Sequence, residues 1–78
     1  MKTVIDTYAW IEIFIGSPQG EKAKEILQKT EEAYTPDIVL AKIARKYIRE
    51  GAKEQAISER LKTIEETSEI AYIDRKQP

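Results

Sequence analysis

The segment from residue 8 to residue 15 constrains the fold most, because it is apolar on nearly every side and carries one charge, Glu12. A helix of that composition is buried on several sides and needs neighbours that cover it. Directly before it, residues 3–5 form a β-branched run that stops at Asp6, which is typical of a short buried strand. A strand followed at once by a buried helix predicts an α/β fold.

The rest of the chain alternates in the same way. The expected helices cover residues 8–15, 17–31, 36–50 and 52–67, and the expected strands cover residues 3–5, 33–35 and 69–73. Thr7 is the expected cap of the first helix, and Gly16 its end. The order β-α-α-β-α-α-β predicts a short parallel sheet flanked by crossover helices. We expect residues 1–78 to form a single but partial domain, since the third strand reads as the middle of an α/β fold.

Composition limits the chemistry that these residues can carry. The chain has no cysteine and no histidine, which excludes disulfides, thiolate ligands and imidazole bases. Metal binding would rest on carboxylates, which suit Mg²⁺ or Mn²⁺. The formal net charge of -1 does not indicate nucleic-acid binding over the whole surface. Since the N-terminus has no long apolar stretch and cysteine is absent, we expect a cytoplasmic protein without a membrane span.

Asp6 is the first candidate site residue. It stands where the first strand ends, and ligands of parallel sheets bind at the carboxyl ends of the strands. Its carboxylate could hold a divalent cation, with the hydroxyl of Thr7 beside it. Alternatively, Asp6 or Thr7 only caps the following helix. The residues alone leave both interpretations open.

Lys42 is the second candidate, because it interrupts the apolar helical run of residues 38–44. A buried, unpaired lysine is strongly destabilising, so this side chain should reach solvent or meet a carboxylate. Asp6 and Glu12 are the candidate partners. The pattern favours the simpler interpretation, a lysine whose stem lies on apolar surface and whose ammonium is solvated.

These two segments resemble the PIN domain family. The sequences that carry the resemblance are TVIDTYAWIEIF at residues 3–14 and AYTPDIVLAKIARKYIREG at residues 33–51. The likeness continues through the fourth helix and the third strand, and it covers the N-terminal part of a PIN domain. The VapC-type toxins, which are single PIN domains paired with an antitoxin, are similar in length and in sequence pattern.

The resemblance implies a metal-dependent endoribonuclease in which several carboxylates hold Mg²⁺ or Mn²⁺. Asp6 matches the first catalytic and metal-binding carboxylate, and Thr7 supplies a hydroxyl beside it. Lys42 stands at the position of the family's second acid, a glutamate, and the remaining acids belong to a later part of the domain. The implied function is an incomplete and impaired ribonuclease that binds RNA and an antitoxin-like protein. The alternative is a non-catalytic PIN-like module for binding or dimerisation.

A lysine at a ligand position opposes metal binding. Two unit charges ~4 Å apart interact by about 4 kcal/mol at an effective dielectric constant of about 20, before screening by salt. Lys42 could instead pair with Asp6 and replace the cation. Glu12 matches no catalytic position of the family. For Asp37 and Asp74, structural roles at helix starts are favoured.

The resemblance also places the first strand near the middle of the family sheet, with the second and third strands on one side. We therefore expect Val4 and Ile5 to lie on an exposed apolar edge. Trp10, Phe14 and Tyr47 would lie near surface that a complete domain covers. Exposed strand edges and apolar patches favour association, so we expect a homo-oligomer, most simply a dimer.

Overall fold

The computed structural model describes residues 2–72. Its elements are, in chain order, β1 (Lys2–Val4), α1 (Thr7–Ile15), α2 (Pro18–Lys29), β2 (Glu32–Pro36), α3 (Asp37–Arg49), α4 (Glu54–Thr67) and β3 (Glu69–Ala71). The predicted order of strands and helices is confirmed. Element ends differ from the expected ends by up to two residues, and α2 is the clearest case because it ends at Lys29. The expected end of the third strand, residue 73, and Asp74 lie outside the described residues.

The three strands form one parallel sheet in the order β1-β2-β3, as predicted from the α/β pattern. The central strand is β2. Val4 of β1 and Glu69 of β3 both lie beside Tyr34 of β2. Within this sheet β1 has one neighbour, so its other edge is free of pairing to residues 2–72.

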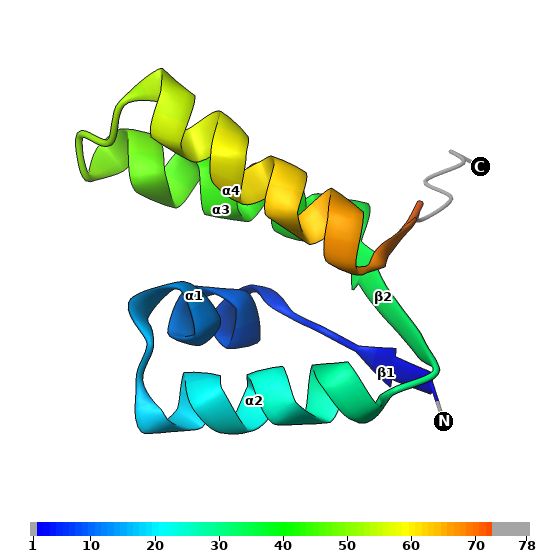
Figure 1. Cartoon of the computed structure of the whole chain (residues 1–78). Helices are drawn as coiled ribbons and strands as arrows, with labels where there is room; N and C mark the ends of the chain where they lie inside the picture. The colour runs from blue at the N-terminus through cyan, green and yellow to red at the C-terminus, as the bar shows by residue number, and fades with distance from the viewer. Residues whose placement is uncertain (1, 73–78) are drawn as a thin grey trace.

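All four helices lie on one side of the sheet. They form two pairs, α1 with α2 and α3 with α4, beside the strands (Figure 1). Parallel crossovers are right-handed, so two crossovers that advance in one direction place their helices on the same face. The strand residues agree: Ile5, Ala33 and Ile70 join the core, whereas Lys2 and Val4 are exposed on the opposite face. The shortest dimension of the molecule, 18 Å, fits one helix layer on one sheet.

The core lies between α1, the α3–α4 pair and the sheet. Its buried apolar residues are Ile5, Trp10, Val39, Ile43, Tyr47, Ile57 and Ile64. The expectation that Trp10 and Tyr47 form exposed apolar surface is therefore wrong, since they are only 1% and 9% exposed. Both belong to the core cluster, and Phe14 stacks on Trp10 with ring centroids 5.7 Å apart. The expected exposure of Ile5 is also wrong, because its side chain points to the helix layer, whereas Val4 is 66% exposed as expected.

The turn between α1 and α2 requires two glycines for different reasons. Gly16 ends α1 in the left-handed region, with φ of 80°, which favours glycine. Ser17 then caps α2 by accepting a hydrogen bond from the Gly20 backbone N–H at 3.0 Å. Gly20 is buried against α1, where a Cβ would overlap the carbonyl group of Glu12 and lie 2.8 Å from the Ile13 nitrogen. The close approach of the two helices therefore depends on the missing side chain.

We predict that Gly20→Ala destabilises the protein by about 2–3 kcal/mol, because the added methyl group overlaps backbone atoms that cannot rotate away. Helix propensity alone would favour alanine by about 1 kcal/mol, so the sign of the change isolates the packing effect. Urea unfolding followed by circular dichroism measures it.

The matched control is Gln19→Ala, an exposed position in the same turn of α2. It should change the free energy of unfolding by less than about 0.5 kcal/mol. If Gly20→Ala were as stable as the parent or more stable, the tight packing of α1 on α2 would be wrong.

Candidate functional site

Asp6 lies at the carboxyl end of β1 and caps α1. Its backbone is extended, with φ of -91° and ψ of 179°, and its Oδ1 accepts a hydrogen bond from the Ala9 backbone N–H at 2.9 Å. The cap of α1 is therefore Asp6, and the expectation that Thr7 caps this helix is wrong, because Thr7 is already its first residue. Asp6 is exposed and Thr7 half-buried. Since capping uses one carboxylate oxygen, the charge and the second oxygen stay available at the surface.

The pairing of β1 with β2 places Asp6 next to the start of α3. The Ile5 backbone N–H donates to the Tyr34 carbonyl at 2.8 Å, which extends the strand contact to the residue before Asp6. Two residues after Tyr34, β2 ends at Pro36, and α3 begins at Asp37. The end of β1 and the start of α3 thus lie together at the carboxyl end of the sheet, where parallel folds bind ligands.

Lys42 is exposed in the second turn of α3, whose buried face consists of Val39, Ile43 and Tyr47. The interpretation of Lys42 as a solvated lysine agrees with this placement. Over residues 2–72, no ion pair joins Lys42 to Asp6 or Glu12. The hypothesis that Lys42 pairs with Asp6 in place of a cation therefore has no support in the structure.

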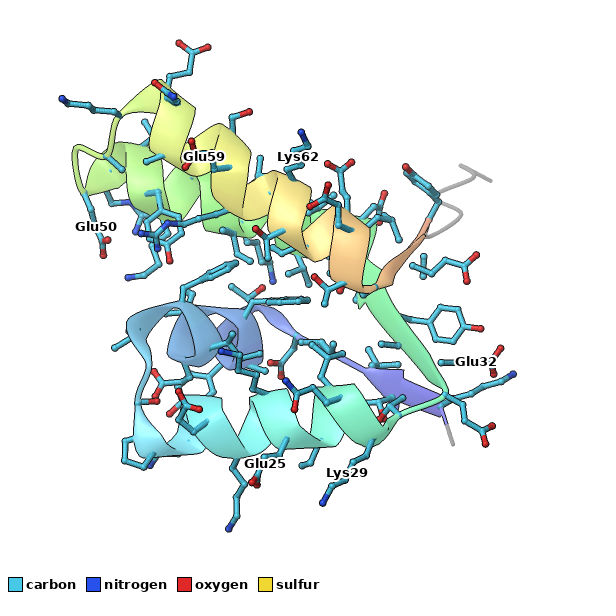
Figure 2. The ribbon with its side chains drawn as sticks, viewed as in Figure 1. Glu25, Lys29, Glu32, Glu50, Glu59 and Lys62 are labelled. Carbon is cyan, nitrogen blue, oxygen red and sulfur yellow. The ribbon has the colours of Figure 1, made fainter. Side chains whose placement is uncertain are left out.

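The carboxylates of the described chain do not gather at this edge. In residues 2–72, no three acidic side chains lie close enough together to hold a metal ion. Glu25, Glu32, Glu50 and Glu59 point outward on different sides of the molecule (Figure 2). Glu12 accepts a hydrogen bond from the Ser17 hydroxyl at 2.6 Å, which is a structural role at the α1–α2 turn. Asp37 lies in the first turn of α3, as expected of a residue that favours a helix start.

One carboxylate does not make a complete site for Mg²⁺ or Mn²⁺. Such cations take six oxygen ligands, and Asp6 with the Thr7 hydroxyl would leave most positions to water or to a bound phosphate. The donor set of residues 2–72 therefore does not fit a closed metal site. This end of the sheet offers the exposed Asp6 carboxylate and, at the start of α3, Asp37, in a helix that also carries the exposed Lys42.

A series of hydrogen bonds inside the molecule joins α1, β2 and the residue after α4, and sequence patterns did not reveal it. The Trp10 Nε1–H donates to Thr35 Oγ1 at 3.0 Å, and Thr35 Oγ1 lies 2.7 Å from the Ser68 hydroxyl oxygen. The Ser68 hydroxyl in turn donates to the Ile64 carbonyl at 2.9 Å. Thr35 is fully buried. The available signal was Trp10 itself, because a buried indole N–H needs an acceptor.

Arg60 is a second residue that sequence patterns did not reveal. Its guanidinium carbon lies 4.8 Å from the Tyr47 ring centroid and 5.5 Å from that of Phe14. The same group donates to the Tyr47 hydroxyl at 3.2 Å. Arg60 thus joins α4 to α3 and α1 through cation–π contacts. A single arginine in a charged helix gives no local sign of such partners.

The open face of the sheet carries the exposed carboxylates of Glu32 and Glu69 together with the exposed Lys2. Tyr34 donates its hydroxyl to Glu32 Oε1 at 3.1 Å. This hydrogen bond, partial burial and the negative charges of Glu32 and Glu69 raise the pKa of Tyr34 above its ordinary value of 10.0. The phenol therefore stays protonated at neutral pH. Neighbouring negative charges make this face a poor surface for RNA phosphates.

The family model described as PIN domain matches residues 3–77, which includes both segments that carry the resemblance. No curated protein and no solved structure matches the chain. None of the helices in residues 2–72 has the length and the continuous apolar sequence that a membrane crossing requires.

We predict that Thr35→Val destabilises the protein by about 1–3 kcal/mol, because valine has a similar shape but leaves the buried Trp10 N–H without its acceptor. The measurement is urea unfolding followed by tryptophan fluorescence, since the chain has a single tryptophan. The matched control is Thr63→Val, an exposed threonine of α4, with an expected change below about 0.5 kcal/mol. Equal effects of the two substitutions would show that the buried hydrogen bond contributes nothing specific.

Proposed function

The chain belongs to the PIN domain family, and on that premise we propose that it is an impaired VapC-type endoribonuclease dependent on Mg²⁺ or Mn²⁺. The family has a nuclease-type fold, is generally metal-dependent and implies RNA binding. The observation that carries the proposal is the position of Asp6. It is exposed at the carboxyl end of β1, where a PIN domain has its first acidic residue.

In this proposal Asp6 is both the catalytic and the metal-binding carboxylate. Its capping bond to Ala9 holds the side chain at the sheet edge and leaves one oxygen for a cation. Thr7 supplies the neighbouring hydroxyl. In metal-dependent nucleases the cation activates water and neutralises charge that develops on the scissile phosphate. Residues 2–72 do not complete the ligand set of such a cation.

Lys42 is the reason to propose impairment. It stands where the family has its second carboxylate, so one ligand is replaced by a group that repels a cation. Its exposure in α3 agrees with a side chain that is free to reach toward RNA phosphate instead. Within residues 2–72, β1 has one strand neighbour and no three acidic side chains gather, which supports the proposal that residues 1–78 are one partial PIN-like domain. The proposed setting is the cytoplasm, with RNA and an antitoxin-like protein as partners.

A second candidate function is a non-catalytic module for binding or dimerisation. The edge of β1 that has no partner strand within residues 2–72 favours it, because such an edge is a template for another strand. The acids of the described chain also support binding more readily than cutting, since no three acidic side chains of residues 2–72 lie close enough together to hold a metal ion.

Cleavage of a single-stranded RNA in Mn²⁺ or in chelator separates the two candidates. We expect weak, Mn²⁺-dependent cutting by the parent chain and about tenfold more by Lys42→Glu, because the substitution replaces a repelling charge with a ligand. Asp6→Asn should abolish the activity without unfolding the protein, since asparagine caps a helix as well as aspartate does.

Lys62→Glu is the matched control. It makes the same charge change at an exposed position of α4 and should leave cutting at the parent rate (Figure 2). Equal gains from Lys42→Glu and Lys62→Glu would contradict a specific site at Lys42. If neither the parent nor Lys42→Glu cuts RNA in Mn²⁺, the ribonuclease proposal fails for this chain and the module for binding or dimerisation replaces it.

A further inference from the structure

Helix α3 is the most basic element of the described chain. Over Asp37–Arg49 it has four basic residues and one acidic residue, a formal charge of +3 in a chain whose total is -1. Its neighbour α4, over Glu54–Thr67, has four acidic and two basic residues, which gives a formal charge of -2. The two helices lie side by side (Figure 1). Positive charge is therefore concentrated on one helix, although the net charge of the chain is close to zero.

Three of these cations share one face of α3. Lys42, Arg45 and Arg49 are spaced by three and four residues, which places them on the same side of a helix, and all three are exposed. Within the described chain none of the three takes part in an ion pair, whereas Lys46 is paired with Glu50 at 2.6 Å. Unpaired cations strongly oppose burial, so this face suits solvent or a polyanion rather than cover by another part of a protein.

The row of cations leads away from the candidate site. Helix α3 begins at the carboxyl end of the sheet, where Asp6 lies. At about 1.5 Å of rise per residue, Lys42 lies about 8 Å and Arg49 about 18 Å along the helix from Asp37. A length of about 18 Å corresponds to about five nucleotides of a stacked single strand, at about 3.4 Å per nucleotide. The row is therefore long enough to follow several phosphates on one side of Asp6.

We propose that the α3 face of Lys42, Arg45 and Arg49 binds the phosphates of single-stranded RNA that flank the nucleotide at Asp6. Each cation contacts the sugar–phosphate backbone, which positions the strand without selecting its sequence. The planar guanidinium groups of the two arginines suit phosphate oxygens in particular. This inference deepens the ribonuclease function proposed above and rests on it, because it names the surface that holds the substrate of that site.

A single strand fits this surface better than a duplex does. Domains that bind double-stranded RNA by its shape span about 16 base pairs. A footprint of that size would extend from α3 over α4, where the exposed Glu59 would repel phosphate (Figure 2). A single strand can follow one helix and avoid the carboxylates of its neighbour.

Binding of a labelled single-stranded RNA of six nucleotides to the full chain in chelator, followed by fluorescence anisotropy, tests this face without cleavage. Three phosphate contacts predict that the logarithm of the binding constant falls against that of the salt concentration with a slope of about -2. Arg45→Gln and Arg49→Gln should each make the slope shallower by about 0.7 and weaken binding about fivefold at low salt. Arg45→Lys keeps the charge and should keep the slope of the parent.

The matched controls are Lys22→Gln in α2 and Lys62→Gln in α4. Each removes one positive charge at an exposed position, so the net charge of the chain changes by the same amount as in Arg45→Gln. Both should keep the parental slope and an affinity within about twofold, because distant surface charges are screened by salt. Equal losses in controls and α3 variants would overturn the proposal. So would an acidic peptide that binds the same face as tightly as the RNA does.

The substitution Lys42→Glu separates RNA binding from catalysis. In chelator it should weaken RNA binding more than Arg45→Gln does, because it places a repelling charge beside a phosphate. In Mn²⁺ with saturating RNA, the same variant should still cut faster than the parent, because it supplies the missing ligand.

The two measurements keep the inference and the proposed function apart. If the parent chain does not bind the RNA at low salt, or if the α3 variants bind it as the parent does, the α3 face is wrong, and cleavage alone then decides the ribonuclease proposal. Binding that the arginine substitutions weaken as predicted, without cleavage in Mn²⁺ by the parent or by Lys42→Glu, supports the RNA-binding face and contradicts only the ribonuclease function.

Discussion

The hydrogen-bonded chain from Trp10 through Thr35 to Ser68 is the constraint on which the rest of the structure depends. It joins α1 to the central strand and to the residue that ends α4, three segments far apart in sequence. Burial of the indole contributes much of the apolar area of a small core, but only if its N–H keeps an acceptor in a medium of low dielectric constant. Thr35 accepts the hydrogen bond from the indole N–H of Trp10, and its own hydroxyl bonds to Ser68. The two hydrogen bonds together link α1 and the residue after α4 to the central strand.

The same arrangement determines what stays exposed. With both helix pairs on one face, the opposite face of the sheet and the outer edge of β1 have no cover from residues 2–72. Asp6 lies at the corner where that edge meets the start of α1. It is engaged as a helix cap through one oxygen and open to solvent through the other. A capping carboxylate of this kind is held in place through one oxygen while the other faces solvent, which suits a ligand for a cation.

Nuclease activity and self-association would therefore both use the region around β1 and Asp6. A metal-dependent site needs additional carboxylates around Asp6, and in residues 2–72 no three acidic side chains lie close enough together to hold a metal ion. Strand pairing needs only the backbone groups of an edge that has no partner strand, and within residues 2–72 β1 has such an edge. The physical requirements for association are thus more nearly met in this chain than those for cleavage.

Local patterns in the sequence were sufficient to predict the order of strands and helices, the parallel sheet and the position of Asp6. These depend on β-branched runs, helical periodicity and breakers such as Gly16, which act between residues close in the chain. Tertiary structure alone decided that Asp6 rather than Thr7 caps α1, because either residue can cap a helix and the choice follows from how far β1 pairs with β2. It also decided that Trp10 is buried and that Gly20 must lack a side chain, since both depend on elements that approach each other only after folding.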